Sequence, residues 1–350
     1  MSSLLERPST PSGSDPRVRQ RSNTRKFLIR PEVGSLVGAI LVFAFFLALA
    51  PPLRSAASIA TVLYASSTVG IMAVAVALLM IGGEYDLSAG VAVTTASLTA
   101  AIISFQLSLN VWVGVAVALA VALGIGWLNG FLLVRTKLPS FLVTLSTFLM
   151  LQGLNLAVTK LFTGGVATQD ISNMSGFAQA RSIFASELTL GSVNLKITVL
   201  WWLLFVAIAT FVLLRTTVGN WIFASGGNAL GALAVGVPVR QTKIGLFMFV
   251  GFCAWFTGMH LLFSFNTVQS GEGVGNEFLY IIAAVIGGCL LTGGYGSAVG
   301  SAIGAFIFGV TTQGIVYADW NPDWFKFFLG ATLLLATLVN TWVRNQAARR

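Results

Sequence analysis

The sequence has few of the side chains that soluble enzymes use for chemistry. Charged residues make up 9% of its 350 residues, and it contains one histidine, His260, and two cysteines, Cys253 and Cys289. A lone imidazole with no Cys, Asp or Glu at ligand spacing is a poor metal site. Both cysteines fall in apolar runs, where a free thiol packs as a small hydrophobic group. We therefore expect no metal site, no cofactor and no disulfide framework.

Motifs of nucleotide and hydrolytic chemistry are missing as well. The chain has no Gly-Lys pair, so it lacks the loop that binds nucleotide phosphates. It has neither the zinc-protease helix motif nor a Gly-x-Ser-x-Gly turn for a nucleophilic serine. The sequence therefore predicts a non-catalytic chain that does not hydrolyse ATP by itself.

What the chain has in abundance is hydrophobic sequence. Hydrophobic residues make up 56% of it and its mean hydropathy is +0.87, as in membrane proteins. Its apolar runs approach or exceed the ~20 residues that a helix needs to cross ~30 Å of hydrocarbon, and only helices satisfy the backbone in such runs. We predict an all-α polytopic membrane protein with about ten transmembrane helices, at 34–50, 57–81, 88–105, 111–134, 140–160, 197–214, 243–264, 277–292, 297–317 and 324–343.

Lys and Arg residues set the predicted orientation, because positive charge favours cytoplasmic loops. Ten crossings place the basic N-terminal and C-terminal tails on one side, so both termini are expected in the cytoplasm. Residues 1–32 lack the apolar core of a signal peptide and predict a disordered basic tail. After this tail we predict a transmembrane domain at 33–343 and a second basic cytoplasmic tail at 344–350. The net charge of +9 then lies beside anionic lipid headgroups and indicates no nucleic-acid partner.

The most informative segment is 82–90, Gly-Gly-Glu-Tyr-Asp-Leu-Ser-Ala-Gly, which places two carboxylates between apolar runs. An ionisable group near the bilayer centre costs at least ~2.5 kcal/mol, so it usually faces a partner or an aqueous pathway. Two interpretations of Asp86 stay open. It either caps the helix that begins near Ser88, or it forms an inner gate with Gly83 and Glu84, whose turn can change shape.

Amides and hydroxyls inside the apolar runs are further candidates for a pathway. Gln152 and Asn155 are three residues apart and share one helical face. Thr144 and Thr147 lie on the same run. Small polar side chains also serve helix packing in membranes, so that alternative stays open. The candidate solute contacts are Ser88, Gln152, Asn155 and Gln313.

The segment 226–240 predicts a short amphipathic helix between glycine turns on the cytoplasmic side. Asn228 is a suitable N-cap residue, and Gly236 can adopt the left-handed conformation that ends a helix. A helix this short has little stability alone, so its apolar face needs a partner. The segment therefore indicates a docking element.

Six glycines lie between Gly287 and Gly300. Glycine permits tight turns and close helix contacts, so this stretch predicts either a cramped hairpin or a re-entrant element that lines a cavity. Both alternatives depend on the same positions, Gly287, Gly288, Gly293, Gly294 and Gly296.

Four motifs, in this order, make the chain resemble a known family. They are Gly-Gly-x-x-Asp-Leu-Ser-x-Gly at 82–90, Pro-Ser-Phe-x-Val-Thr-Leu at 139–145, Gly-Gly-Asn at 226–228, and a run at 277–288 with Ile-Ala-Ala before Gly-Gly, followed by Gly-Gly-x-Gly-Ser. Over roughly residues 35–345 the chain resembles the inner-membrane permease subunits of bacterial ABC importers in the ribose, xylose and simple-sugar branch. That branch lies within the branched-chain-type permease superfamily.

The resemblance implies a permease that pairs with a second permease copy, identical or related, in the lipid bilayer. It also implies a periplasmic or lipid-anchored substrate-binding protein, and two ATP-binding subunits or one tandem ATPase. The coupling loop would be 226–242. Its coupling residues would be Asn228, Ala229, Leu230, Gly231, Gly236 and Val237, although the helix lacks the basic residue common in the family.

By the same resemblance, the expected function is translocation of a monosaccharide or related polyol across the bacterial inner membrane by alternating access. Permeases for nucleosides or branched-chain amino acids are alternatives within the superfamily. An ion-coupled secondary carrier, in which Glu84 and Glu277 or Asp86 titrate, is an alternative from another class. A membrane scaffold without transport is a third, and it predicts no solute-dependent ATPase activity in any reconstituted complex.

Overall fold

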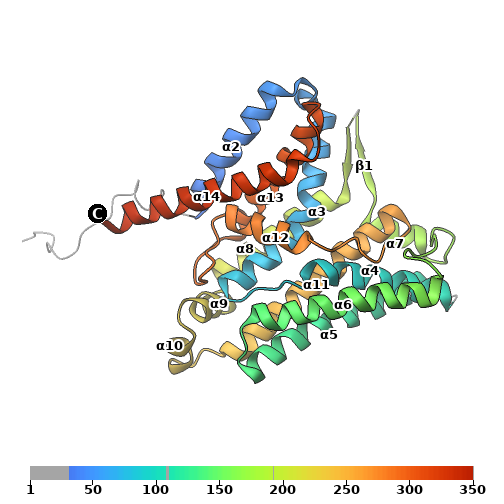
Figure 1. Ribbon diagram of the computed structural model, residues 1–350, viewed down its shortest axis with the longest axis horizontal. Helices are drawn as coiled ribbons and strands as arrows, with labels where there is room; N and C mark the ends of the chain where they lie inside the picture. Colours follow the sequence, from blue (N-terminus) through green and yellow to red (C-terminus); the bar gives the residue numbers. More distant parts are fainter. Residues whose placement is uncertain (1–30, 108–109, 192, 350) are drawn as a thin grey trace, which may run out of the picture.

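The computed structural model describes residues 31–107, 110–191 and 193–349 (Figure 1). Its longer helices are α2 (Pro31–Leu49), α3 (Ala56–Ile81), α4 (Ala89–Gln106), α5 (Val111–Thr136), α6 (Ser140–Thr163), α8 (Ile197–Arg215), α11 (Val239–Phe265), α13 (Ala298–Tyr317) and α14 (Trp324–Arg349). The short elements are η1 (Pro51–Arg54), α7 (Phe177–Phe184), α9 (Thr217–Gly227), α10 (Ala229–Ala234), α12 (Asn276–Ile286) and the strands β1 (Glu187–Leu190) and β2 (Val193–Lys196).

The all-α membrane fold is confirmed. Within the described residues, eight helices are long and apolar enough to span a membrane: α2, α3, α4, α5, α6, α8, α11 and α13. They correspond to eight of the ten predicted spans.

The two remaining predicted spans, 277–292 and 324–343, are not among these eight helices. The segment 277–292 was predicted too long: α12 has 11 residues, too few to cross ~30 Å at ~1.5 Å per residue. It ends because Gly287 caps it and Gly288 has a φ of +93°. The segment 324–343 lies within the helix α14 as predicted, and the stretch of it that begins at Trp324 and whose side chains are described is an apolar helix as far as Leu335.

The predicted tails overlap the structure only in part. Most of the predicted tail 1–32 lies outside the described residues, and its last two residues begin α2. The C-terminal segment 344–349 continues α14 as helix. The helical part of the chain is therefore slightly longer at both ends than the predicted transmembrane domain.

The centre of the bundle is formed by α3, α4 and α11. Within their most apolar windows, 78%, 78% and 72% of the residues are buried, against 17% in α2, which lies at the periphery. Glycines bring α5 close to α11: a Cβ added to Gly130 would lie 2.7 Å from the Ile244 Cα, and one added to Gly126 would lie 2.9 Å from the Met248 Cα. The order of these contacts makes the two helices antiparallel.

Two small structures lie at opposite ends of the bundle. At one end, β1 and β2 form an antiparallel hairpin next to α7. An ion pair between Lys196 and Glu187 closes this hairpin and lowers the pKa of Glu187. At the other end, after the 19 residues of α8, the chain forms α9 and α10 (Figure 1).

The lone histidine is buried and hydrogen-bonded between helices. His260 is 1% exposed and lies on α11 near the hairpin end. Its Nδ1 is 2.8 Å from the Phe184 carbonyl oxygen, and its Nε2 is 3.2 Å from the Tyr64 hydroxyl. The ring therefore joins α7 and α3 to α11, while Cys253 and Cys289 are buried as free thiols.

Candidate functional site

The loop that joins α3 to α4 contains the two central carboxylates and is held by hydroxyls of α6. The Tyr85 backbone N–H donates to Ser140 Oγ over 3.1 Å, and the Leu87 N–H donates to Thr144 Oγ1 over 3.1 Å. Pro139 directly precedes α6 and has no N–H to donate. The Pro-Ser-Phe motif and Thr144 thus fix the shape of the 82–88 loop, and Thr144 faces that loop rather than open space.

Asp86 begins a chain of buried side-chain hydrogen bonds. Its Oδ1 accepts from the Ser88 N–H (2.8 Å) and from Ser88 Oγ (2.6 Å). Asn129 on α5 donates from Nδ2 to Ser88 Oγ (2.9 Å), and Thr147 on α6 donates to Asn129 Oδ1 (2.7 Å). All four residues are buried. This Asp86–Thr147 chain links the start of α4 to α5 and α6.

The bonds of Asp86 do not decide between its two predicted roles. The carboxylate accepts the N–H of Ser88, the residue directly before α4. The side chain of Ser88, at the N-cap position, makes no capping bond to α4. The cap and the gate both stay hypotheses.

Glu84 faces a different partner. It forms an ion pair with Lys243 in the first turns of α11, and their side chains are 9% and 18% exposed. Burial of a charge is costly unless it is paired. The two acids that the sequence places together therefore act separately, since Glu84 ties the loop to α11 while Asp86 ties it to α5 and α6.

The proposed solute contacts are only partly brought together. Asn155 is buried and accepts from Thr95 Oγ1 over 3.0 Å, beside a cavity of about 420 Å³ between α4 and α6. Gln152, one turn away, is half-buried and makes no side-chain hydrogen bond among the described residues. Gln313 lies on α13, which packs against α2, α3 and α12, whereas α6 packs against α4 and α5. The structure therefore does not group Gln313 with the amides of α6.

Three of the glycine motifs meet at the end of α3, in a contact that we call the glycine junction: Gly82, Gly83, Gly226, Gly227, Gly293 and Gly294. The Gly294 N–H donates to the carbonyl oxygen of Ile81 over 2.8 Å. A Cβ added to Gly293 would lie 2.7 Å from the Gly83 Cα, and one added to Gly226 would overlap the Ile81 carbonyl oxygen. Only glycine allows these three backbones to approach so closely.

The remaining hairpin glycines shape the turn between α12 and α13. Gly288 and Gly293 have φ of +93° and +78°, in the left-handed region. A Cβ on Gly287 would lie 2.5 Å from the Ser301 nitrogen, and one on Gly296 would lie 2.6 Å from Cys289 Sγ. The segment is thus a tight turn after a short helix that packs closely on the next helix.

The predicted docking helix exists as α10. The Asn228 side chain accepts from the Gly231 N–H over 2.9 Å, which confirms the N-cap. At its other end Gly236 has a φ of +84°, and the N–H groups of Gly236 and Val237 donate to the carbonyls of Leu233 and Ala232. This is the Schellman pattern of helix termination.

The side chains of α10 are unusually exposed for apolar groups. Leu230 is 81% exposed, Val235 80% and Leu233 48%, while Ala232 is buried. Directly before Asn228, the last two residues of α9 belong to the glycine junction. An exposed apolar helix is therefore connected, through one residue, to the end of the central helix α3.

These features define a membrane-embedded helical bundle with an exposed apolar helix, α10, at one end. Residues 58–337 match the family described as branched-chain amino acid transport system / permease component. The match covers most of the chain, and the chain belongs to this family of permeases. It is therefore the permease component of a transport system.

Curated relatives are similar over nearly their whole length. The fructose import permease protein FrcC of Rhizobium meliloti is 28% identical, over 89% of this chain and 86% of the relative. The ribose import permease protein RbsC of Escherichia coli K12 is 29% identical (88% and 93%). The galactose/methyl galactoside import permease protein MglC of the same strain is 28% identical (91% and 97%). No solved structure matches the chain significantly.

Sequence reasoning missed two residues of this site. Asn129 is a single amide inside the apolar run 111–134, and that isolation was a usable signal, because a buried amide in a membrane helix needs a partner. Lys243 is one of the Lys and Arg residues that indicate the cytoplasmic side. Its pairing with Glu84 depends on the packing of α11 against the loop, which no local pattern reveals.

Proposed function

We propose that the chain is the permease subunit of an ATP-driven importer in the bacterial inner membrane, and that it translocates a monosaccharide or related polyol by alternating access. The fructose, ribose and galactose permeases among its relatives support the substrate class. The family supports a non-catalytic role. The proposed partners are two ATP-binding subunits or one tandem ATPase, a periplasmic or lipid-anchored binding protein, and a second permease copy.

The observation that carries this proposal is the exposed helix α10 next to the glycine junction. We infer that Leu230 and Leu233 of α10, together with Val235 directly after it, insert into a groove of the ATPase. Movement of α10 then reaches the end of α3 through Asn228 and the junction. From there it reaches the 82–88 loop, whose partners lie on α5, α6 and α11.

The same assignment orients the molecule. With α10 facing the ATPase, the α5–α6 turn lies on the cytoplasmic side too, because α5 is antiparallel to α11. The hairpin and α7 then face the binding protein. The basic residues Arg135 and Lys137 in the turn agree with this orientation, in which both termini are cytoplasmic.

The alternative of an ion-coupled carrier requires carboxylates that are free to exchange ions. Glu84 is paired with Lys243, Asp86 accepts two bonds from Ser88, and Glu277 accepts the Gly275 N–H at 3.1 Å. All three therefore have fixed partners, which favours structural and coupling roles for them.

Uptake in proteoliposomes tests the proposal. The complex of permease, ATPase and binding protein is reconstituted, and entry of a radiolabelled sugar is measured with internal or external ATP, or with a proton or sodium gradient instead. The importer predicts uptake that needs both ATP at the ATPase face and the binding protein. Uptake by the permease alone under an ion gradient would establish a carrier, and calorimetry of the binding protein distinguishes sugars from nucleosides and amino acids.

A further inference from the structure

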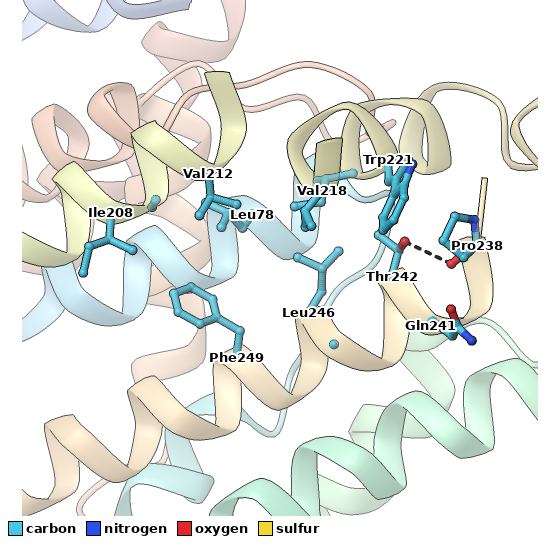
Figure 2. Close-up of a pocket in the computed structure, with 13 residues that line it drawn as sticks. Leu78, Ile208, Val212, Val218, Trp221, Pro238, Gln241, Thr242, Leu246 and Phe249 are labelled. Atoms are coloured by element: carbon cyan, nitrogen blue, oxygen red, sulfur yellow. Dashed lines mark hydrogen bonds between the residues drawn. The ribbon is translucent and has the colours of Figure 1, made fainter. Parts of the chain in front are cut away.

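A hollow of about 350 Å³ lies between α3, α8, α9 and α11 (Figure 2). Five of its lining residues are buried: Leu78, Ala209, Ile222, Thr242 and Leu246. Ile208 and Val218, by contrast, are 50% and 43% exposed, so the hollow reaches the protein surface. Gly245 is exposed, and a Cβ added to it would meet no atom within 4 Å. The space beside Gly245 is therefore left open by the protein's own side chains.

The two ends of the hollow differ in chemistry. Figure 2 shows Trp221, Pro238, Gln241 and Thr242 at one end and Ile208 and Phe249 at the other. Because Pro238 directly precedes α11, the first end lies towards the docking-helix end of the bundle, whereas Ile208 and Phe249 lie deeper along α8 and α11. Tryptophan is typical of the membrane–water interface, and Gln241 and Thr242 carry polar groups there. One end is thus suited to a polar group and the other to hydrocarbon.

Two arginines are close in sequence to residues that line the hollow. Arg240 lies between two lining residues, Pro238 and Gln241, and Arg215 ends α8 three residues after the lining residue Val212. Both arginines are exposed, and within the described part of the chain neither forms an ion pair. Arginines at the cytoplasmic boundary of a membrane attract anionic lipid headgroups.

We propose that this hollow binds an acyl chain of an anionic glycerophospholipid from the cytoplasmic leaflet, with its phosphate near Arg240 and Arg215. Water does not fill an apolar cavity, and an empty one forfeits the dispersion contacts of its walls. Hydrocarbon is the solvent at this depth. The proposal goes beyond the transport function, because it assigns a lipid site directly beside α9, the helix that leads into Asn228 and α10.

Native mass spectrometry of the purified complex tests this site. The complex is exchanged into detergent with added phosphatidylglycerol or phosphatidylcholine, and bound lipids are counted for wild type and for Gly245→Phe, whose ring fills the hollow. Gly124→Phe on α5 and Gly153→Phe on α6 are matched controls, because both glycines are exposed and an added Cβ there also meets no atom within 4 Å. Gly245→Leu carries the same test if the phenylalanine variant does not fold.

Wild type and both controls are expected to retain at least one phosphatidylglycerol per permease chain that Gly245→Phe loses. Arg240→Gln is expected to lower the preference for phosphatidylglycerol over phosphatidylcholine by about fivefold. An equal lipid count in Gly245→Phe and wild type would overturn the site. A changed oligomeric state in Gly245→Phe, with the lipid count unaltered, would assign the hollow to a second permease copy instead. Equal retention of both lipids by wild type would overturn the role of the anionic headgroup.

Discussion

Removal of the Asn129 amide tests the Asp86–Thr147 chain most sharply. Asn129 is fully buried and makes two side-chain hydrogen bonds, one donated to Ser88 Oγ and one accepted from Thr147 Oγ1. Hydrogen bonds between membrane helices contribute on average ~0.6 and at most ~1.7 kcal/mol each. After Asn129→Ala, the Ser88 hydroxyl still donates to Asp86 and the Thr147 hydroxyl still donates to the Val143 carbonyl. No donor is orphaned, so the expected loss of unfolding free energy is about 1–2 kcal/mol.

The assay is equilibrium unfolding of the purified permease in mixed detergent micelles, with a double-mutant cycle between Asn129→Ala and Thr147→Val. The cycle should give a coupling free energy of about 0.6–1.7 kcal/mol. Gln152→Ala is the matched control, because this amide lies on α6 without a side-chain hydrogen bond among the described residues, and its effect should stay within about 0.5 kcal/mol. A coupling energy near zero, or equal losses for Asn129→Ala and Gln152→Ala, would refute the reasoning.

Two further substitutions test the junction and the gate. Gly226→Ala should lower the unfolding free energy by about 1–3 kcal/mol, because its Cβ would overlap the Ile81 carbonyl oxygen. Gly227→Ala is the control and should lower the unfolding free energy far less, because the atom nearest to its Cβ is 3.9 Å away. Equal losses in the two variants would contradict close packing at the junction. Asp86→Asn should fold normally, because the amide oxygen can accept both bonds from Ser88, while sugar uptake in proteoliposomes falls. Undiminished uptake in that variant would leave Asp86 as a cap alone.

The local features of this fold could be read from the sequence. Apolar length predicted ten spans, and eight of them are helices long and apolar enough to cross a membrane. Residue type predicted both ends of α10, because Asn at an N-cap and Gly after a helix act through bonds within a few residues. The predicted span 277–292 was longer than α12. Hydropathy does not distinguish an apolar helix from an apolar turn, and glycine backbone angles ended the helix at Gly287.

The assembly of the site could not be read in the same way. Gly83, Gly226 and Gly293 each stood out in the sequence, but their meeting at Ile81 depends on how α3, α9 and the α12–α13 turn pack. Glu84 and Asp86 likewise have different partners only because of helix packing. Glu84 pairs with Lys243 on α11, and Asp86 is linked through Ser88 to Asn129 on α5. The segment 177–196, which forms α7 and the β1–β2 hairpin, has no sequence pattern strong enough to predict those elements.

The most direct test of the coupling role of α10 is sugar-dependent ATP hydrolysis by the reconstituted complex in nanodiscs. Leu230→Asp places a charge on the most exposed side chain of α10 without touching the bundle. Leu138→Asp is the control, because Leu138 is exposed in the α5–α6 turn at the same end of the molecule. The account predicts that Leu230→Asp abolishes the stimulation of ATP hydrolysis by sugar-loaded binding protein, while Leu138→Asp retains it. Full stimulation in the Leu230→Asp complex would contradict the role of α10 as the coupling helix.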